Sequence, residues 1–175
     1  MKIFLWSFFF LQTGALWGAY PVLQGKDLVS GRTVEWKAGG QPSLVVFLSP
    51  LCPCSRSHEK PLAKLASDFP SVRFLGIVSF AEKKQGEEYF KKSSLPFPVL
   101  PEPQSEWADA FSALNTPHAF LFDGTGALVF QGGVDNSGNA ENATRFYLRE
   151  ALTALNEGKE IAEKQARPLG CPIRR

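Results

Sequence analysis

The sequence lacks the features that identify nucleic-acid-binding proteins and repeat proteins. Its 19 basic and 17 acidic residues leave a formal net charge of +2, and no block or stripe of like charge stands out. The electrostatic footprint of a nucleic-acid partner is therefore missing. No internal repeat is visible, and 175 residues with 44% hydrophobic content suffice for one well-buried core but are few for a second large domain. We expect a single domain and no nucleic-acid partner.

Cysteine is also scarce, with 3 residues in the whole chain, and the number is odd. In an oxidising compartment, cysteines pair with one another or are held reduced by dedicated partners. One of the three must therefore remain free, pair transiently or bind something. This asymmetry indicates chemistry rather than structural cross-linking.

The start of the chain has the order of a secretory signal. One positive residue precedes an apolar run over residues 3–11, and small residues follow. We expect a signal peptide over residues 1–19, cut after Ala15 or Ala19, then a mature domain over residues 20–175 with a periplasmic or other extracytoplasmic location. The alternative is an uncleaved anchor, although a spanning helix requires about 20 steadily apolar residues. Contact with a membrane is expected only through such an uncleaved signal.

Hydrophobic patterning predicts alternating strands and helices. The expected strands are two short ones joined as a hairpin within 26–36, a central one over 44–48, and others over 72–80, around Val99, and over 118–122 and 127–131. The expected helices are 54–68, interrupted by Pro61, and 81–93, 106–114 and 144–155. A βαβ start followed by an antiparallel hairpin and a closing helix predicts an α/β fold, with a mixed central sheet and helices on both faces.

Two of the expected helices have a clear apolar face. The face of the helix over 106–114 consists of Trp107, Phe111 and Leu114. The inward face of the closing helix consists of Leu148, Ala151, Leu152 and Leu155. We expect both faces to pack against the sheet.

The candidate reactive group is Cys52, which directly follows the central strand and begins the first helix. Backbone N–H groups and the helix dipole at that position favour a thiolate, so the pKa of Cys52 should be lowered. Pro53 fits the first helical turn, where its missing N–H would have had no partner, and Ser55 stands where a C-x-x-C motif has its second cysteine. We expect an ionised, accessible thiol; the alternative is a buried, inert cysteine.

The sequence leaves the roles of the other two cysteines open. Cys54 is two residues from Cys52, so a bond between them would close a strained and easily reduced ring. Cys54 is a partner or merely a packed residue. Cys171 lies in the tail ARPLGCPIRR, in which Leu169 and Ile173 could anchor the chain. Cys171 would then be the resolving thiol, a free surface thiol or a structural partner of Cys54.

Thr116 and Pro117 open the strand over 118–122, where an X-Pro bond is a candidate cis peptide. A cis bond there would leave the preceding backbone unpaired, so that Thr116 could pair with an incoming peptide. A trans proline that merely begins a strand is the alternative. A metal site of Cys52, Cys54 and His118 also stays open, because sulfur ligands with a histidine suit Cu(I) or Zn. Otherwise no metal or cofactor is expected.

Three pieces of the sequence together resemble a known family: Cys52-Pro53, the stretch TPHAFLFDGTGALVFQGGVDN and the terminal GCPIRR. The chain, from about Gly25 to its C-terminus, resembles the redoxin branch of the thioredoxin superfamily, which includes peroxiredoxin-like and alkyl hydroperoxide reductase/thiol-specific antioxidant domains. The resemblance implies a thioredoxin-like fold, Cys52 as nucleophile and Pro117 as a cis-proline facing it. Cys171 matches the tail cysteine of a subgroup with a G-C-x-I-[KR] ending.

These observations predict an exported thiol–disulfide oxidoreductase in which Cys52 attacks disulfides or oxidised thiols of proteins or small molecules. Cys171 or Cys54 would release the product, and a reductant that the sequence does not identify would restore the thiols. One alternative is an antioxidant thiol peroxidase that forms a sulfenic acid on Cys52. Another is a non-enzymatic chaperone for Cu(I) or for assembly. Val46 stands where thioredoxins carry a buried acid, which weakens the match to general dithiol reductases.

Overall fold

The computed structural model describes residues 20–175, and the predicted signal peptide lies outside the described residues. The strands are β1 (Leu23–Lys26), β2 (Thr33–Trp36), β3 (Ser43–Leu48), β4 (Arg73–Val78), β5 (Val99–Pro101), β6 (Asn115–Thr116), β7 (His118–Phe122), β8 (Leu128–Gly132) and β9 (Cys171–Pro172). The helices are α1 (Pro53–Ser57), α2 (Glu59–Asp68), α3 (Lys83–Phe90), α4 (Glu106–Ala110) and α5 (Tyr147–Asn156), with short 3₁₀ turns η1 (Phe80–Glu82) and η2 (Ala140–Asn142). Within this part of the chain, no helix combines the length and the apolar character needed to cross a membrane.

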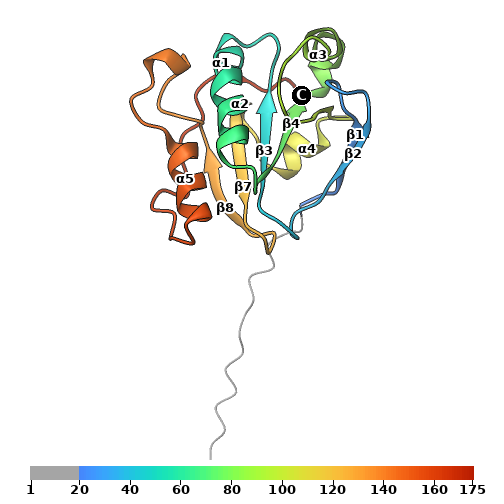
Figure 1. The fold of residues 1–175 in the computed structure, drawn as a ribbon. Helices are drawn as coiled ribbons and strands as arrows, with labels where there is room; N and C mark the ends of the chain where they lie inside the picture. Colours follow the sequence, from blue (N-terminus) through green and yellow to red (C-terminus); the bar gives the residue numbers. More distant parts are fainter. Residues whose placement is uncertain (1–19) are drawn as a thin grey trace, which may run out of the picture.

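A five-stranded sheet in the order β5-β4-β3-β7-β8 forms the centre of the molecule (Figure 1). Strand β3 lies in its middle, and all six of its residues are buried, as its continuous apolar run predicts. It pairs in parallel with β4 and antiparallel with β7. Because β7 runs against β3, its first residue, His118, lies opposite Phe47 near the carboxyl end of β3. The residues just before β7 are thereby brought to the edge of the sheet where Cys52 follows β3.

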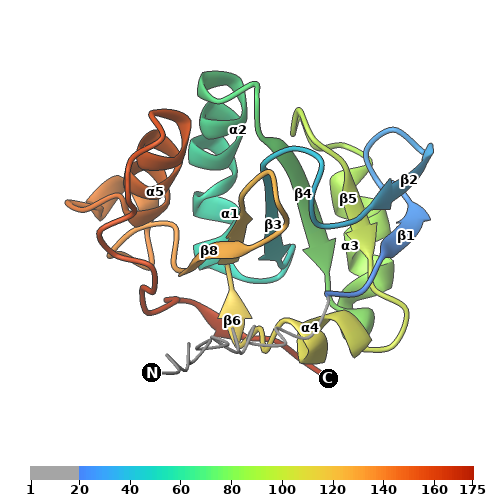
Figure 2. The same cartoon turned by 90° about the horizontal axis from the view of Figure 1, so that it is seen from below.

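Helices cover both faces of the sheet, as predicted. On one face, α2 and α5 bury Leu62, Leu65 and Leu148 against the sheet. On the other face, α4 buries Trp107 beside Trp36 of the β1–β2 hairpin. The hairpin is a separate two-stranded sheet, so it extends the fold without joining the central one (Figure 2). Burial of these large apolar side chains, at about 25 cal/mol per Å², is the main force that holds the layers together.

The predicted interruption of the first helix exists but lies three residues before Pro61. Helix α1 ends at Ser57 and α2 begins at Glu59, with His58 between them. A proline ring clashes with the carbonyl four residues earlier, which is that of Ser57, so the break precedes the proline. Pro61 itself lies in the first turn of α2, where its missing N–H has no intrahelical partner to lose.

Two expectations for helix faces and ends are wrong. Helix α4 ends at Ala110, where the N–H of Ala113 bonds to the carbonyl of Ala108 at 2.8 Å and Ser112 has a φ of 51°. This left-handed C-terminal turn reverses the chain and carries Leu114 outward, where 58% of it is exposed. Helix α5 begins at Tyr147 rather than Thr144, although its predicted inward residues Leu148, Ala151 and Leu152 are buried.

Candidate active site

Cys52 is the N-cap of α1, with φ −88° and ψ 117°, and Pro53 is the first helical residue. The turn between β3 and α1 is fixed by two serines. Ser49 Oγ accepts the N–H of Cys52 at 3.1 Å, and Ser55 Oγ accepts the N–H of Ser49 at 2.9 Å. The sequence singled out Pro53 and Ser55 as support for the cysteine, and their geometry fits that role. Ser49 is a further positioning group, which its sequence context did not reveal.

The sulfur of Cys52 is in contact with two distant segments. The protonated thiol donates to the carbonyl oxygen of Thr116 at 3.3 Å, and the N–H of Cys171 donates to the sulfur at 3.3 Å. Burial by itself raises the pKa of Cys52, but hydrogen bonds from the Cys171 thiol and from the amides of Ser55 and Cys171 outweigh it. The pKa of Cys52 is therefore lower than that of an ordinary cysteine, so its thiolate forms more readily.

The C-terminal tail covers this sulfur. Strand β9 pairs antiparallel with β6, and Cys171 lies opposite Thr116 (Figure 2). The peptide bond between Thr116 and Pro117 is cis, as the sequence suggested. Only 1% of Cys52 is exposed, so the expectation of an accessible thiol is wrong for this conformation. The backbone of the tail lies against the sulfur and contributes to its burial.

All three cysteines are thiols in this structure, and Cys54 and Cys171 lie close enough to Cys52 for their pKa values to depend on one another. Burial and the adjacent charge of Cys52 raise the pKa of Cys54. Burial, the hydrogen bond with Cys52 and the neighbouring negative charges raise the pKa of Cys171 to about 12. The cluster is therefore asymmetric: Cys52 loses its proton more readily than an ordinary cysteine, and Cys54 and Cys171 lose theirs less readily.

A buried acid next to the cluster, Glu82, was missed by the sequence analysis. Glu82 follows β4 in η1, at the same sheet edge as Cys52. It is 6% exposed, and its Oε2 has no hydrogen-bond partner within residues 20–175. Its negative charge contributes to the raised pKa of Cys171, after burial and the two other thiols. The sequence analysis considered only position 46 on β3, where a buried valine stands, and not the residues that follow β4.

A buried hydrogen-bonded pair connects the end of α1 to the loop after β8. His58 Nε2 donates to Asp135 Oδ2 at 3.0 Å. His58 Nδ1 lies 2.7 Å from the carbonyl oxygen of Cys54 and 3.1 Å from Ser57 Oγ. The side chains of His58 and Asp135 are 1% and 2% exposed. The aspartate belongs to the stretch TPHAFLFDGTGALVFQGGVDN, but nothing in the sequence linked it to His58.

His118 is placed for packing rather than for metal binding. Its Nδ1 accepts the N–H of Leu114 at 3.2 Å, and its ring lies 4.4 Å from that of Phe120 between centroids. Burial lowers the pKa of His118 to about 4, so the ring is neutral near pH 7. No three histidine, cysteine or acidic side chains within residues 20–175 are grouped so that they could hold a metal ion.

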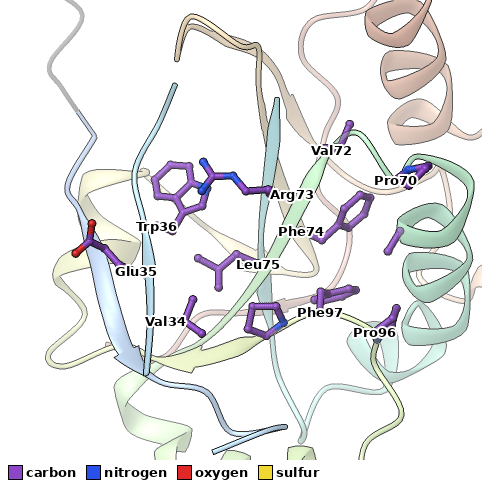
Figure 3. Close-up of a pocket in the computed structure, with 12 residues that line it drawn as sticks. Val34, Glu35, Trp36, Pro70, Val72, Arg73, Phe74, Leu75, Pro96 and Phe97 are labelled. Carbon is purple, nitrogen blue, oxygen red and sulfur yellow. The ribbon is translucent and has the colours of Figure 1, made fainter. Parts of the chain in front are cut away.

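A hollow of about 360 Å³ lies at the opposite end of the sheet (Figure 3). Trp36, Phe74, Leu75 and Phe97 line it together with three prolines. Strand β4 begins there, and β4 runs parallel to β3, so about 20 Å of strand separates the hollow from Cys52. No cysteine lines it, and it is separate from the thiol cluster.

Comparisons with known proteins find this fold in proteins of several bacteria. No protein-family model matches the chain, and no curated protein matches it. An uncharacterized conserved protein from Geobacillus kaustophilus is 29% identical over 90% of each chain, with a TM-score of 0.78. A hypothetical protein from Sinorhizobium meliloti 1021 is 26% identical over 89% of this chain and 91% of that one, with a TM-score of 0.76.

A third solved structure is a secreted Mycobacterium tuberculosis disulfide oxidoreductase homologous to Escherichia coli DsbE. It is 20% identical over 76% of this chain and 96% of that one, with a TM-score of 0.58. At this identity the likeness concerns the fold alone. The chain therefore has the thioredoxin-like fold that its sequence predicted, with a mixed five-stranded sheet and helices on both faces.

Proposed function

We propose that this protein is a thiol–disulfide oxidoreductase in which Cys52 is the nucleophile and Cys171 the resolving thiol. The observation that carries the proposal is the N–H of Cys171 on the Cys52 sulfur at 3.3 Å, in a strand register that holds the two residues together. Cys54 also lies close, but its bond to Cys52 would close a strained ring within one helical turn. The strand pairing therefore favours Cys171 as the partner.

The reaction has two exchange steps. The Cys52 thiolate attacks one sulfur of a client disulfide; a mixed disulfide forms, and the other client sulfur leaves with the bonding electrons and takes up a proton from water. Cys171 then loses its proton and attacks the sulfur of Cys52. A Cys52–Cys171 disulfide forms, and the second client sulfur leaves as a thiolate. The client gains two electrons and two protons, which an external thiol reductant returns to the protein.

The proposed site of action is outside the cytoplasm. Residues 1–19 have the order of a secretory signal, and one structure of the same fold is described as a secreted protein. The proposed clients are disulfides or oxidised thiols of proteins or small molecules. A client strand would pair with the backbone of Thr116, which lies beside the reactive sulfur.

The test is to trap the mixed disulfide in a Cys171→Ser variant. With a chromogenic aromatic disulfide as the probe, the reduced variant should release one coloured thiol per Cys52 and keep the other as a stable adduct. The native protein should release both, because Cys171 attacks the adduct. Absorbance counts the released thiol, and mass spectrometry identifies the adduct on Cys52.

Cys54→Ser is the matched variant, since it makes the same change at the other neighbouring thiol. It should release both coloured thiols, as the native protein does. A stable adduct in Cys54→Ser and none in Cys171→Ser would assign the resolving role to Cys54. Failure of the native protein to react with the probe, even over long times, would overturn the proposed function.

A further inference from the structure

The tail segment, residues 169–173, occupies a specific docking position over Cys52, which we call its seat. Beside the pairing of β9 with β6, Asn115 Nδ2 donates to the carbonyl of Gly170 at 2.8 Å, and the N–H of Ile173 donates to the carbonyl of Leu114 at 2.9 Å. The side chain of Ile173 is buried in the core cluster on that face. Figure 1 shows the C-terminus at the end of the molecule to which the β3 arrow points. The tail segment thus occupies the edge to which a client strand would add.

Glycines shape this seat, because only they allow so close an approach of the two backbones. Gly170 has a φ of +153°, and a Cβ on it would lie 2.0 Å from the carbonyl oxygen of Thr116. Upstream, a Cβ on Gly132 would lie 2.2 Å from the carbonyl oxygen of Ala166. The path of the tail is therefore fixed at two separate points. A side chain at position 170 is incompatible with the docked strand.

The contacts that hold the segment are short in sequence and partly exposed, and they include a hydrogen bond from Arg175 Nη2 to the carbonyl of Ala113 at 2.9 Å. Strand β9 has two residues, and Pro172 and the two terminal arginines are exposed. The ion pair of Arg175 with Asp109 is largely solvent-exposed, so it contributes about 1 kcal/mol at most. Short terminal segments with few buried contacts open at a lower free energy than the core of a protein. We therefore expect the tail segment to open at a lower free-energy cost than global unfolding.

We propose that the tail segment is a self-docked strand that shields Cys52, and that an extended client polypeptide displaces it to reach the sulfur. The identification of the client edge rests on the proposed function. While the tail segment is docked, reagents cannot reach the sulfur of Cys52. The observed reaction rate of Cys52 is therefore its rate in molecules with an undocked tail, multiplied by the fraction of such molecules. The client takes the place of β9 beside Thr116, with its own cysteine near the position of Cys171. A glycine immediately before that client cysteine would take the position of Gly170, where a Cβ has no room.

Alkylation of Cys52 by iodoacetamide tests the cover directly. In this reaction the Cys52 thiolate forms a carbon–sulfur bond and iodide leaves. Gly170→Ala should raise the rate at Cys52 at least about tenfold, because the alanine side chain prevents docking. Asn115→Ala, which removes one hydrogen bond, should give a smaller increase. Rates are compared at the high-pH plateau, where Cys52 is ionised in every variant, and peptide mapping separates the three cysteines.

Gly158→Ala is the control variant, since Gly158 also has a positive φ but a Cβ on it would meet no other atom within 4 Å. It should react at the native rate. A thermal unfolding scan shows whether the Gly170→Ala protein stays folded. If it does not, the alkylation rate of the Asn115→Ala protein provides the test. Native-like rates in both tail variants would overturn the cover. If the tail variants are alkylated fast but the native protein shows no disulfide exchange, the proposal that the tail shields Cys52 stands and the proposed function is rejected.

Added peptides test whether a strand from another chain can take the same seat. The probe is a peptide of residues 168–175 with serine in place of Cys171, added in millimolar excess to the Gly170→Ala protein. It should slow alkylation of Cys52, whereas the same peptide with alanine at the position of Gly170 should not. Equal rates with both peptides, whether slowed or not, would contradict displacement by a strand in this register.

Discussion

Replacing Cys52 by serine is expected to lower the rate of disulfide exchange by at least about 10³-fold, the order of loss seen when an enzyme's nucleophile is removed. A serine hydroxyl has a pKa so far above that of a thiol that hydrogen bonds of the kind that lower the pKa of Cys52 leave it protonated at neutral pH. The measurement is turnover of the chromogenic disulfide with a dithiol reductant in excess. The substituted protein should show the rate of the reductant alone.

The fold of the Cys52→Ser protein should survive, because serine is smaller than cysteine and can accept the N–H of Cys171. Its thermal unfolding midpoint should therefore stay within a few degrees of the native value. Residual turnover close to the native rate would transfer the nucleophilic role to Cys54 or Cys171. In that case the lowered pKa of Cys52 would have no part in the reaction.

Replacing Asp135 by alanine is expected to destabilise the protein by about 1–3 kcal/mol, the usual cost of leaving a buried hydrogen-bonding group without its partner. His58 Nε2, which is buried together with Asp135, would lose the carboxylate oxygen that accepts its hydrogen bond. Chemical denaturation followed by circular dichroism measures the loss. Asp135→Asn should cost less, because its amide oxygen can still accept from His58.

Arg149→Ala is the matched control for an exposed ion pair. Arg149 Nη1 lies 2.9 Å from Asp68 Oδ2, but the two side chains are 40% and 29% exposed. Removing this pair should leave the free energy of unfolding nearly unchanged, because solvent screens the exposed charges. If Asp135→Ala costs no more than Arg149→Ala, the buried pair does not hold α1 to the loop after β8, and its closeness to Cys54 has no structural consequence.

Much of the site followed from local sequence because local spacing determines it. A cysteine directly after a buried apolar strand and before a proline becomes the N-cap of the next helix, and Cys52 is found there. The same reasoning placed Pro117 at the start of β7 as a candidate cis-proline. In both cases the residues that set the geometry are neighbours along the chain, so their patterns could be read directly.

What the sequence did not reveal depends on residues far apart along the chain. The sequence did single out Thr116 and Cys171, which lie 64 and 119 residues from Cys52, but it did not indicate that the tail pairs with β6 and covers the sulfur. It therefore predicted an accessible thiol where the structure has a covered one. His58 is 77 residues from Asp135, and no pattern linked the two. Glu82 was missed for a similar reason, because parallel strands bring η1 to the edge where β3 ends.

The central claim is that one sulfur of the cluster ionises well before the other two. It is tested most directly by a pH titration of the fully reduced native protein, followed through the NMR resonances of isotope-labelled cysteine Cβ atoms. The thiolate of Cys52 should appear as the pH rises through a value below 9, the ordinary pKa of the group, while Cys171 should stay protonated until about pH 12. Cys54 should ionise above 9. If all three cysteines titrate together near pH 9, the cluster does not activate Cys52, and the account is contradicted.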